Sequence, residues 1–283
     1  MEKRSSDGPL PFKLPGRVYL AGAGPGSAAL LTVRALEVLQ SADVVFHDDL
    51  VSEDVLARIP AHVAVFSVGK RCGSHKTTQA EILKRLIQAV QHGKTVVRLK
   101  GGDPLIFART HEEMAALREA GIDFEVIPGI TAATAAAAVA KIPLTERHNA
   151  SRLVLVSNHR CADKEARDWQ AGVTANATLV FYMPGPDFTE LRAELLENGV
   201  REETPCLLVS NAARPDQKLV RTTVGALLRA PVLPAPSLLI VGATAAEAKE
   251  AEKGSISRDE GAPIKAMTEL SLDLLQTREV GTD

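Results

Sequence analysis

The sequence predicts an α/β protein with a mainly parallel sheet, and three observations carry this prediction. Apolar runs of strand length alternate with segments of helical periodicity through the first half of the 283-residue chain. Glycine-rich loops, at residues 22–26 and 101–103, directly follow two of these runs. Apolar residues make up 45% of the chain but aromatic residues only 4%, so small aliphatic side chains are expected to pack closely between layers.

The first half is expected to contain five strands and three helices. The strands are short runs rich in β-branched residues, at 18–21, 44–46, 63–66, 95–99 and 124–127. Residues 30–42 and 79–92 space their apolar side chains about 3.6 residues apart and are expected to form amphipathic helices. Residues 131–140, almost entirely Ala and Thr, predict a helix that can approach a sheet or a ligand closely.

A second alternating set follows a connector at residues 142–144. Its expected strands are 153–157, 177–183, 205–209, 218–223 and 237–241. Residues 187–198 predict a helix with Asp187 as N-cap and Gly199 just past its end. The run 218–223 has few helical neighbours, so antiparallel strands are expected in this half.

The expected domains are an N-terminal tail at 1–15, α/β domains at 16–144 and 145–247, and a charged, disordered tail at 248–283. A short helix is expected within that tail at 267–275.

Composition excludes several classes of function. A net charge of −2 gives no bulk electrostatic reason to expect nucleic-acid binding. Cys72, Cys161 and Cys206 lie far apart without CxxC spacing, which predicts reduced thiols in a cytoplasmic protein. No signal peptide is recognisable in residues 1–15, no run approaches the ~20 apolar residues of a membrane helix, and the histidines lack metal-ligand spacing.

The two glycine loops together predict one ligand site, because open α/β sheets bind ligands at the carboxyl ends of their strands. Gly101 and Gly102 leave the backbone accessible, and Asp103 adds a carboxylate. Taken alone, each loop is more simply an ordinary tight turn. A dinucleotide fingerprint is disfavoured because its third glycine would fall on Ser27, and a Walker motif would need glycine at Gln88.

Several separated motifs occur in an order that resembles the tetrapyrrole methylases, from about Arg17 to Ala243. They are VYLAGAGPG (18–26), DDLV (48–51), VGKR with Gly73 and His75 (68–75), VRLKGGDPLIF (97–107), PGITA (128–132), IPLT (142–145), FYM (181–183) and NAARPDQ (211–217). Within that family, VGKRxGxH and NAxxPDQ are most similar to the enzymes that methylate uroporphyrinogen III.

The resemblance implies a two-domain class III methyltransferase fold with the methyl donor in the interdomain cleft, and a homodimer. The implied donor is S-adenosyl-L-methionine, which leaves as S-adenosyl-L-homocysteine, and the implied substrate is a tetrapyrrole. The residues that the resemblance assigns to the donor site are Pro25, Gly101, Gly102, Asp103, Ile106, Thr131, Ala132, Met183 and Ala212.

By the same resemblance, Asp48 would accept a proton and Lys70 would donate one during two methylations that yield precorrin-2, a precursor of sirohaem, cobalamin and haem d1. Without the resemblance, Asp48 is more simply a turn residue after a strand, and Lys70 a solvated loop lysine. Arg109 would assist proton transfer, with Glu112 orienting it. Arg71, Arg109 and Arg147 would surround the substrate carboxylates, and Glu112 would lie on the same, substrate-binding side of the site.

The chain departs from the family pattern mainly on the substrate side. Thr110 and His111 stand where two glycines are usual, and Ala108, Glu146 and Ser27 also differ. These departures keep three alternatives open: a methyltransferase for a later precorrin, one for a non-tetrapyrrole acceptor, and a non-catalytic S-adenosylmethionine-binding relative. A dinucleotide oxidoreductase is a more distant fourth.

Overall fold

The computed structural model describes residues 16–69, 78–158, 169, 172–173 and 176–248, all within one compact unit, Met1–Ala251. The expected tail at 1–15, and all of the expected tail at 248–283 except its first residue, lie outside the described residues. The expected division into domains at residues 144 and 145 stays a prediction.

The first half forms a five-stranded sheet in which every pair of neighbours is parallel, as expected. Its spatial order is β3-β2-β4-β1-β5. The strands are β1 (Val18–Gly22), β2 (Val44–His47), β3 (Ala64–Ser67), β4 (Val96–Lys100) and β5 (Phe124–Ile127). Because the strands are parallel, the loops that follow β1, β2, β4 and β5 meet at one edge of the sheet.

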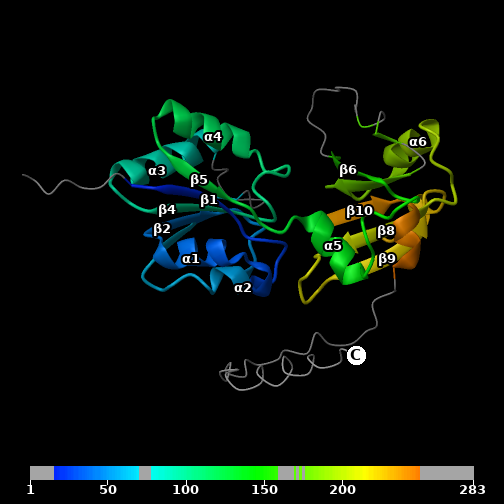
Figure 1. Ribbon diagram of the computed structural model, residues 1–283, viewed down its shortest axis with the longest axis horizontal. Helices are drawn as coiled ribbons and strands as arrows, with labels where there is room; N and C mark the ends of the chain where they lie inside the picture. Colours follow the sequence, from blue (N-terminus) through cyan, green and yellow to red (C-terminus); the bar gives the residue numbers. More distant parts are fainter. Residues whose placement is uncertain (1–15, 70–77, 159–168, 170–171, 174–175, 249–283) are drawn as a thin grey trace, which may run out of the picture. The chain divides into compact units, whose positions relative to one another are not determined.

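Helices cover both faces of this sheet (Figure 1). α1 (Val33–Ser41) and α2 (Glu53–Leu56) pack on one face, and α3 (Gln79–Gln91) and α4 (Thr110–Glu119) pack on the other. Thr32 caps α1 through its hydroxyl, and Thr78 and Glu81 form a reciprocal capping box on α3. Alternate residues of the strands therefore contribute to two separate apolar layers.

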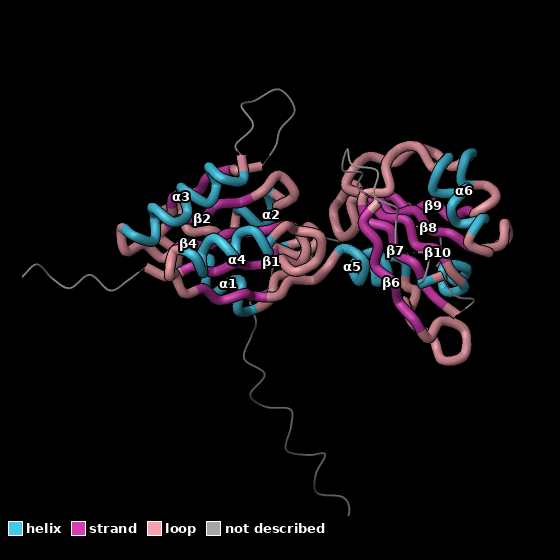
Figure 2. Tube along the Cα trace, turned by 90° about the horizontal axis from the view of Figure 1, so that it is seen from above, coloured by secondary structure: helices cyan, strands magenta, loops and turns pink. Residues whose placement is uncertain are grey.

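The second half forms a mixed five-stranded sheet of order β6-β7-β10-β8-β9 (Figure 2). The strands are β6 (Arg152–Ser157), β7 (Ala177–Tyr182), β8 (Pro205–Ser210), β9 (Lys218–Thr223) and β10 (Ser237–Val241). Only β6 and β7 pair in parallel, so the expected antiparallel strands are confirmed. Alanines of α5 (Ala132–Ala140) pack on one face of this sheet, and leucines of α6 (Thr189–Glu197) pack on the other.

Two expectations about local structure were wrong, and two helices, α2 and α4, were not expected at all. α6 begins after Phe188, and Asp187 is not its N-cap, although an Asp187 carboxylate oxygen accepts a bond from the Thr189 N–H at 2.8 Å. The first helix begins at Val33, because a separate 3₁₀ turn, Ala28–Leu30, precedes it. Two further 3₁₀ turns are Leu227–Arg229 and Ala243–Glu247. Among the described helices, none has the length and apolar content needed to cross a membrane.

Candidate functional site

The two glycine loops contact each other directly at the carboxyl edge of the first sheet. Gly24 and Gly102 exchange both backbone hydrogen bonds, at 3.1 and 2.8 Å, and the Ala23 N–H donates to the Lys100 carbonyl at 2.7 Å. The loop after β5 packs just as closely, because a Cβ on Gly22 would lie 2.6 Å from the Gly129 Cα atom. The glycines are therefore required for the backbones of three neighbouring loops to meet.

Asp103 links its own loop to the loop that follows β5. One of its carboxylate oxygens accepts from the Gly129 N–H at 3.0 Å and the other from the Leu105 N–H at 2.7 Å. Gly102 has a φ of +70°, and a Cβ added there would meet only the Ala132 nitrogen, at 3.9 Å. The backbone at Gly102 is thus left open to a ligand, beside a carboxylate that is already fixed in place.

Asp48 lies at the same edge, directly after β2. Its carboxylate accepts from the Leu50 N–H at 3.1 Å and from the Gly101 N–H at 3.3 Å. These bonds include the turn contact that the residue type alone predicts. They also attach the Asp48 carboxylate to the Gly101–Gly102 loop, so Asp48 and the expected donor loop are held together.

The second sheet contributes Tyr182 and Met183 at the end of β7. The Tyr182 hydroxyl lies 2.5 Å from the Thr131 hydroxyl and accepts from the Ala133 N–H at 3.1 Å, so it caps α5 in place of a side chain from the helix itself. Burial raises the pKa of Tyr182, although both hydrogen bonds oppose the shift. Met183, with a φ of +52°, is 46% exposed, and therefore offers apolar surface to a ligand.

The remaining expected donor residues lie on neighbouring segments. Ile106, Ala132 and Ala212 all pack against the apolar cluster formed by α5 and the second sheet. Phe107 packs edge-on against Tyr182, with ring centroids 5.0 Å apart. The Pro25 carbonyl accepts a hydrogen bond from the Arg214 guanidinium at 3.3 Å. Contacts thus connect every part of the expected donor set, which comes from five separate loops.

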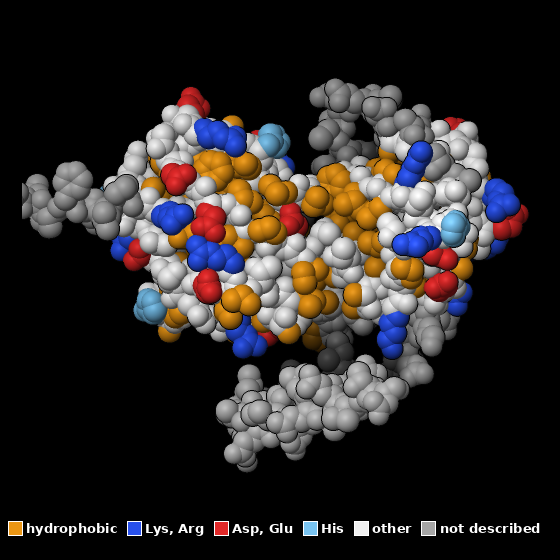
Figure 3. Space-filling view, in the orientation of Figure 1, with side chains coloured by type: hydrophobic (Ala, Val, Ile, Leu, Met, Phe, Trp, Pro, Cys, Tyr) orange, Lys and Arg blue, Asp and Glu red, His pale blue; other side chains and the backbone are white. Residues whose placement is uncertain are grey.

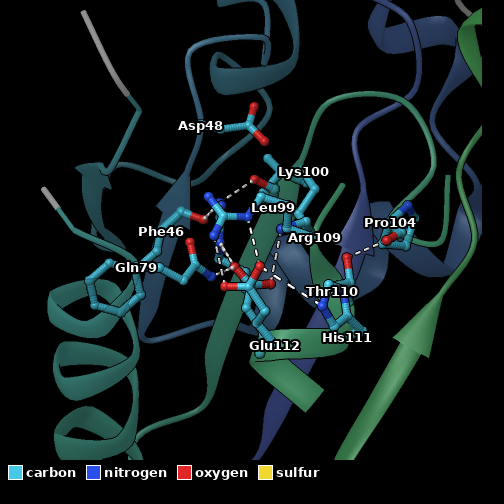
Figure 4. Close-up of polar contacts among 12 residues, drawn as sticks. Phe46, Asp48, Gln79, Leu99, Lys100, Pro104, Arg109, Thr110, His111 and Glu112 are labelled. Atoms are coloured by element: carbon cyan, nitrogen blue, oxygen red, sulfur yellow. Dashed lines mark hydrogen bonds and ion pairs between the residues drawn. The ribbon is translucent and has the colours of Figure 1, made fainter. Parts of the chain in front are cut away.

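Arg109 and Glu112 form a bidentate ion pair at the start of α4 (Figure 4). The Arg109 Nε and Nη2 atoms donate to the two Glu112 oxygens at 2.7 and 2.9 Å. Hydrogen bonding from Arg109 lowers the pKa of Glu112 below its ordinary value. Arg109 has a left-handed backbone, with a φ of 54°, and its side chain is 58% exposed. Two bonds from Glu112 therefore hold the Arg109 guanidinium, and the role of this pair in the site stays a prediction.

A buried charge cluster that was not expected lies behind this pair. Glu113 is fully buried and accepts from the Arg98 Nε and the Lys100 Nζ atoms, each at 3.0 Å. The Gln79 amide adds a third bond at 3.2 Å. Burial alone would raise the pKa of Glu113, but the two cations outweigh it and hold the pKa below its ordinary value. Burial and the Arg98 charge lower the pKa of Lys100, against the opposing charges of Glu113 and Asp48.

Two expected site residues, Lys70 and Arg71, lie outside the described residues. Arg147 is exposed in a turn closed by backbone bonds between Glu146 and Ala150, and the contacts that join the donor set do not include it. The Glu146 carboxylate in that turn accepts from the Asn149 amide at 3.1 Å. The structure therefore brings Asp48 and the donor residues together but does not join Arg147 to them.

The departures at residues 108–111 are accommodated by the start of α4. Thr110 is buried, and its hydroxyl donates to the Pro104 carbonyl, which closes the turn after Asp103. His111 points outward, with 82% of its side chain exposed.

Basic and acidic side chains are interspersed over the face shown in Figure 3. Among the described residues, no group of three or more His, Cys, Asp and Glu side chains is arranged to hold a metal.

Comparison with known proteins places these features in a family. The profile of the Tetrapyrrole (Corrin/Porphyrin) Methylases matches residues 17–228. The chain is 46% identical to a uroporphyrinogen-III C-methyltransferase of Paracoccus denitrificans over 240 residues, 83% of each protein. It is 44% identical to siroheme synthase 1 of Klebsiella pneumoniae over 82% of this chain, and spans about half of that relative, 50%.

A solved structure supports the same relationship. Uroporphyrin-III C-methyltransferase from Thermus thermophilus, complexed with S-adenosyl homocysteine, superimposes with a TM-score of 0.69 at 35% identity. The match covers 80% of this chain and 92% of that one. The α/β fold expected from the resemblance is thereby confirmed.

Proposed function

The chain belongs to the tetrapyrrole methylase family, and from this membership we propose that it converts uroporphyrinogen III to precorrin-2 by two successive C-methylations. The observation that carries the proposal is the pair of joined glycine loops with the Asp48 carboxylate bound to the Gly101 N–H. This arrangement places an ionisable group beside a backbone surface that is open to a ligand. The chain spans about half of the siroheme synthases it matches, so their further activities are not assigned to it.

S-adenosyl-L-methionine is the methyl donor, and the described residues fit it. The backbone at Gly102 faces open space, where a small ligand can approach main-chain groups. Met183 and Ile106 offer apolar surface, and the Thr131 hydroxyl and Asp103 carboxylate offer polar contacts. When bound, the donor supplies an electrophilic methyl group on a sulfonium. S-adenosyl-L-homocysteine is the product that remains.

The protein's part in the reaction is to hold the reactants in line and to move protons. Asp48 accepts a proton from the macrocycle, since its carboxylate is oriented by two N–H donors at the edge of the donor loop. Lys70 returns a proton. Arg109, fixed by Glu112, assists this transfer. Correct placement of the reacting carbon supplies much of the rate increase.

The substrate carries several carboxylates, which suits recognition by arginine. Arg71 and Arg147 bind these groups, because a guanidinium pairs with a carboxylate through two parallel bonds. Glu112 shapes the same side of the site by orienting Arg109. We also propose that the protein acts as a cytoplasmic homodimer; both statements rest on the sequence resemblance and on the cysteine pattern.

The first test is an anaerobic assay with S-adenosyl-L-methionine and uroporphyrinogen III, read by absorbance and mass spectrometry. A product heavier by two methyl groups is expected, and Asp48→Asn should slow its formation by about 10²–10⁴. Unchanged turnover in Asp48→Asn would remove the acid–base role. Absence of product despite measurable donor binding would favour another precorrin or a non-catalytic relative.

A further inference from the structure

Arg214 joins two loops of the first sheet to a turn of the second. It lies in the turn between β8 and β9, yet its Nη2 atom donates to the Leu50 carbonyl at 2.6 Å and its Nε atom to the Pro25 carbonyl at 3.3 Å. These carbonyls are 164 and 189 residues away along the chain. The guanidinium therefore spans the loop that contains Pro25 and the loop that contains Asp48.

Both acceptors belong to segments with a role in the proposed reaction. The Leu50 N–H donates to the Asp48 carboxylate, so one residue links that carboxylate to Arg214. Pro25 belongs to the expected donor set, and Ala212 of the same set lies two residues before Arg214. Arg214 thus contacts or adjoins three segments that must be aligned for methyl transfer.

The turn that presents Arg214 is built to hold it. Asn211 and Ala213 both have positive φ values, 50° and 59°, which non-glycine residues adopt only where the surroundings fix them. The Asn211 amide donates to Asp216 at 2.6 Å, and the Ala213 N–H donates to the Gln217 side chain at 3.2 Å. The NAARPDQ motif is therefore explained as a framework of side-chain bonds around one projecting arginine.

The space for Arg214 is reserved by a glycine. A Cβ on Gly26 would lie 2.5 Å from the Arg214 Cγ atom and 2.9 Å from its Nε atom. Gly26 does not have a positive φ that would itself demand glycine. Its lack of a side chain therefore allows Arg214 to reach the Pro25 and Leu50 carbonyls.

We propose that Arg214 is a positioning residue that aligns the donor loop at Pro25 with the Asp48 loop and with the Ala212 turn. The proposal rests on the proposed function, because it assigns these three segments to one reaction site. Arginine suits the task, since its planar fork donates in two directions at once, whereas lysine offers a single flexible point of charge. Loss of the side chain should weaken donor binding even where the fold is intact.

The experiment is calorimetric titration of S-adenosyl-L-homocysteine into the full-length wild type and its variants. Arg214→Gln should raise the dissociation constant about tenfold or more, and Arg214→Lys by less, since lysine keeps one charged donor. Gly26→Ala should also weaken binding, because its new methyl group displaces the Arg214 side chain. In the double variant the two effects should not add, since both remove the same contacts.

Arg221→Gln is the matched control. Arg221 lies on β9 and also donates to a backbone carbonyl, that of Ala246 at 2.7 Å, but away from the donor residues. Its replacement should leave the dissociation constant unchanged. In steady-state assays, Arg214→Gln should raise the KM for S-adenosyl-L-methionine and leave the KM for uroporphyrinogen III within twofold.

Two results would overturn the assignment. Arg214→Gln that binds S-adenosyl-L-homocysteine as tightly as the wild type, while unfolding at a lower temperature, would make Arg214 purely structural. Additive losses in the Gly26→Ala and Arg214→Gln double variant would show that the two residues act separately. A wild type that binds no S-adenosyl-L-homocysteine would instead defeat the proposed function and, with it, the role of Arg214.

Discussion

Glu112 and Glu113 are neighbours on α4, yet they occupy opposite electrostatic environments. Glu113 is fully buried between Arg98 and Lys100, whereas Glu112 is 30% exposed and pairs with an Arg109 that is 58% exposed. Successive helical residues point about 100° apart, so one carboxylate faces the sheet and the next faces the site. Both carboxylates are ion-paired, but only Glu113 has lost its contact with water.

This difference decides what each pair contributes. In the interior, water cannot screen a charge, so Glu113, Arg98 and Lys100 depend on one another. At the surface, water and salt compensate when a partner is lost, so Glu112 contributes little to stability and serves to orient Arg109. The buried cluster therefore supports the loop that begins at Gly101, and the exposed pair is the one proposed to take part in the chemistry.

The largest expected effect is from Glu113→Ala. This change strands two buried cations and should reduce the free energy of unfolding by about 3–5 kcal/mol. Urea unfolding followed by circular dichroism measures the loss. Glu119→Ala, at the end of the same helix, is the control and should change stability by less than about 1 kcal/mol. Equal losses in the two variants would contradict the dependence on buried charge.

The second expected effect is a difference in acid stability. The pKa of Glu113 is lowered from 4.5 in the folded state, so the unfolded chain binds this proton first as the pH falls. The ionised Glu113 carboxylate therefore contributes fully to the free energy of unfolding above the unfolded-state pKa of 4.5. This contribution is lost as the pH falls through the lower, folded-state pKa. Unfolding free energies of the wild type and Glu113→Gln should converge below pH 4.5, and a constant gap would contradict this account.

A smaller loss is expected from Thr110→Val, on the same buried face of α4. Valine has nearly the same shape but cannot donate to the Pro104 carbonyl, which would lose its partner. The free energy of unfolding should fall by about 1–2 kcal/mol. Thermal unfolding with Thr134→Val as the control tests this, since the Thr134 hydroxyl donates to the Thr131 carbonyl at an exposed position. A harmless Thr110→Val would mean that this departure from the family pattern has no structural role.

The same helix shows where sequence reasoning succeeds and where it fails. The strands were predicted closely because their apolar runs are short and sharply bounded; the expected range 124–127 coincides with β5 (Phe124–Ile127). α4 was missed because the residues that it buries are Thr110, Glu113 and Leu117, two of which are polar. Its apolar periodicity is therefore too weak to recognise.

The candidate site was also predicted only in part, because some of its residues are recognisable from local sequence and others are not. Glycines and Asp103 could be found because loop geometry limits which residues fit there. Glu113, Tyr182 and Arg214 were missed as site residues, since their importance depends on partners more than ten residues away. The charged residues within the run VVRLK, Arg98 and Lys100, were the available signal for a buried counter-charge. A sequence cannot show which carboxylate supplies it.

Glu112→Gln should have the smallest effect on stability and yet a measurable effect on turnover. The glutamine keeps the shape of the side chain but cannot hold Arg109 through two charge-assisted bonds, so stability should change by less than about 1 kcal/mol. The kcat should fall several-fold, because Arg109 loses its fixed orientation, while the dissociation constant for S-adenosyl-L-homocysteine stays the same. Glu119→Gln, on the same helix and exposed, removes the same charge and is the control for a general change of charge.

The effect of salt on kcat and on stability further separates the exposed Arg109–Glu112 pair from the buried Glu113 cluster. Raising the ionic strength to about 1 M shortens the screening length to about 3 Å, so the exposed Arg109–Glu112 pair should weaken while the buried cluster is little affected. The wild-type kcat should then fall toward that of Glu112→Gln, with no matching loss in the free energy of unfolding. If Glu112→Gln instead destabilised the protein as much as Glu113→Ala, the two carboxylates would share one structural role, and the division between support and chemistry along α4 would fail.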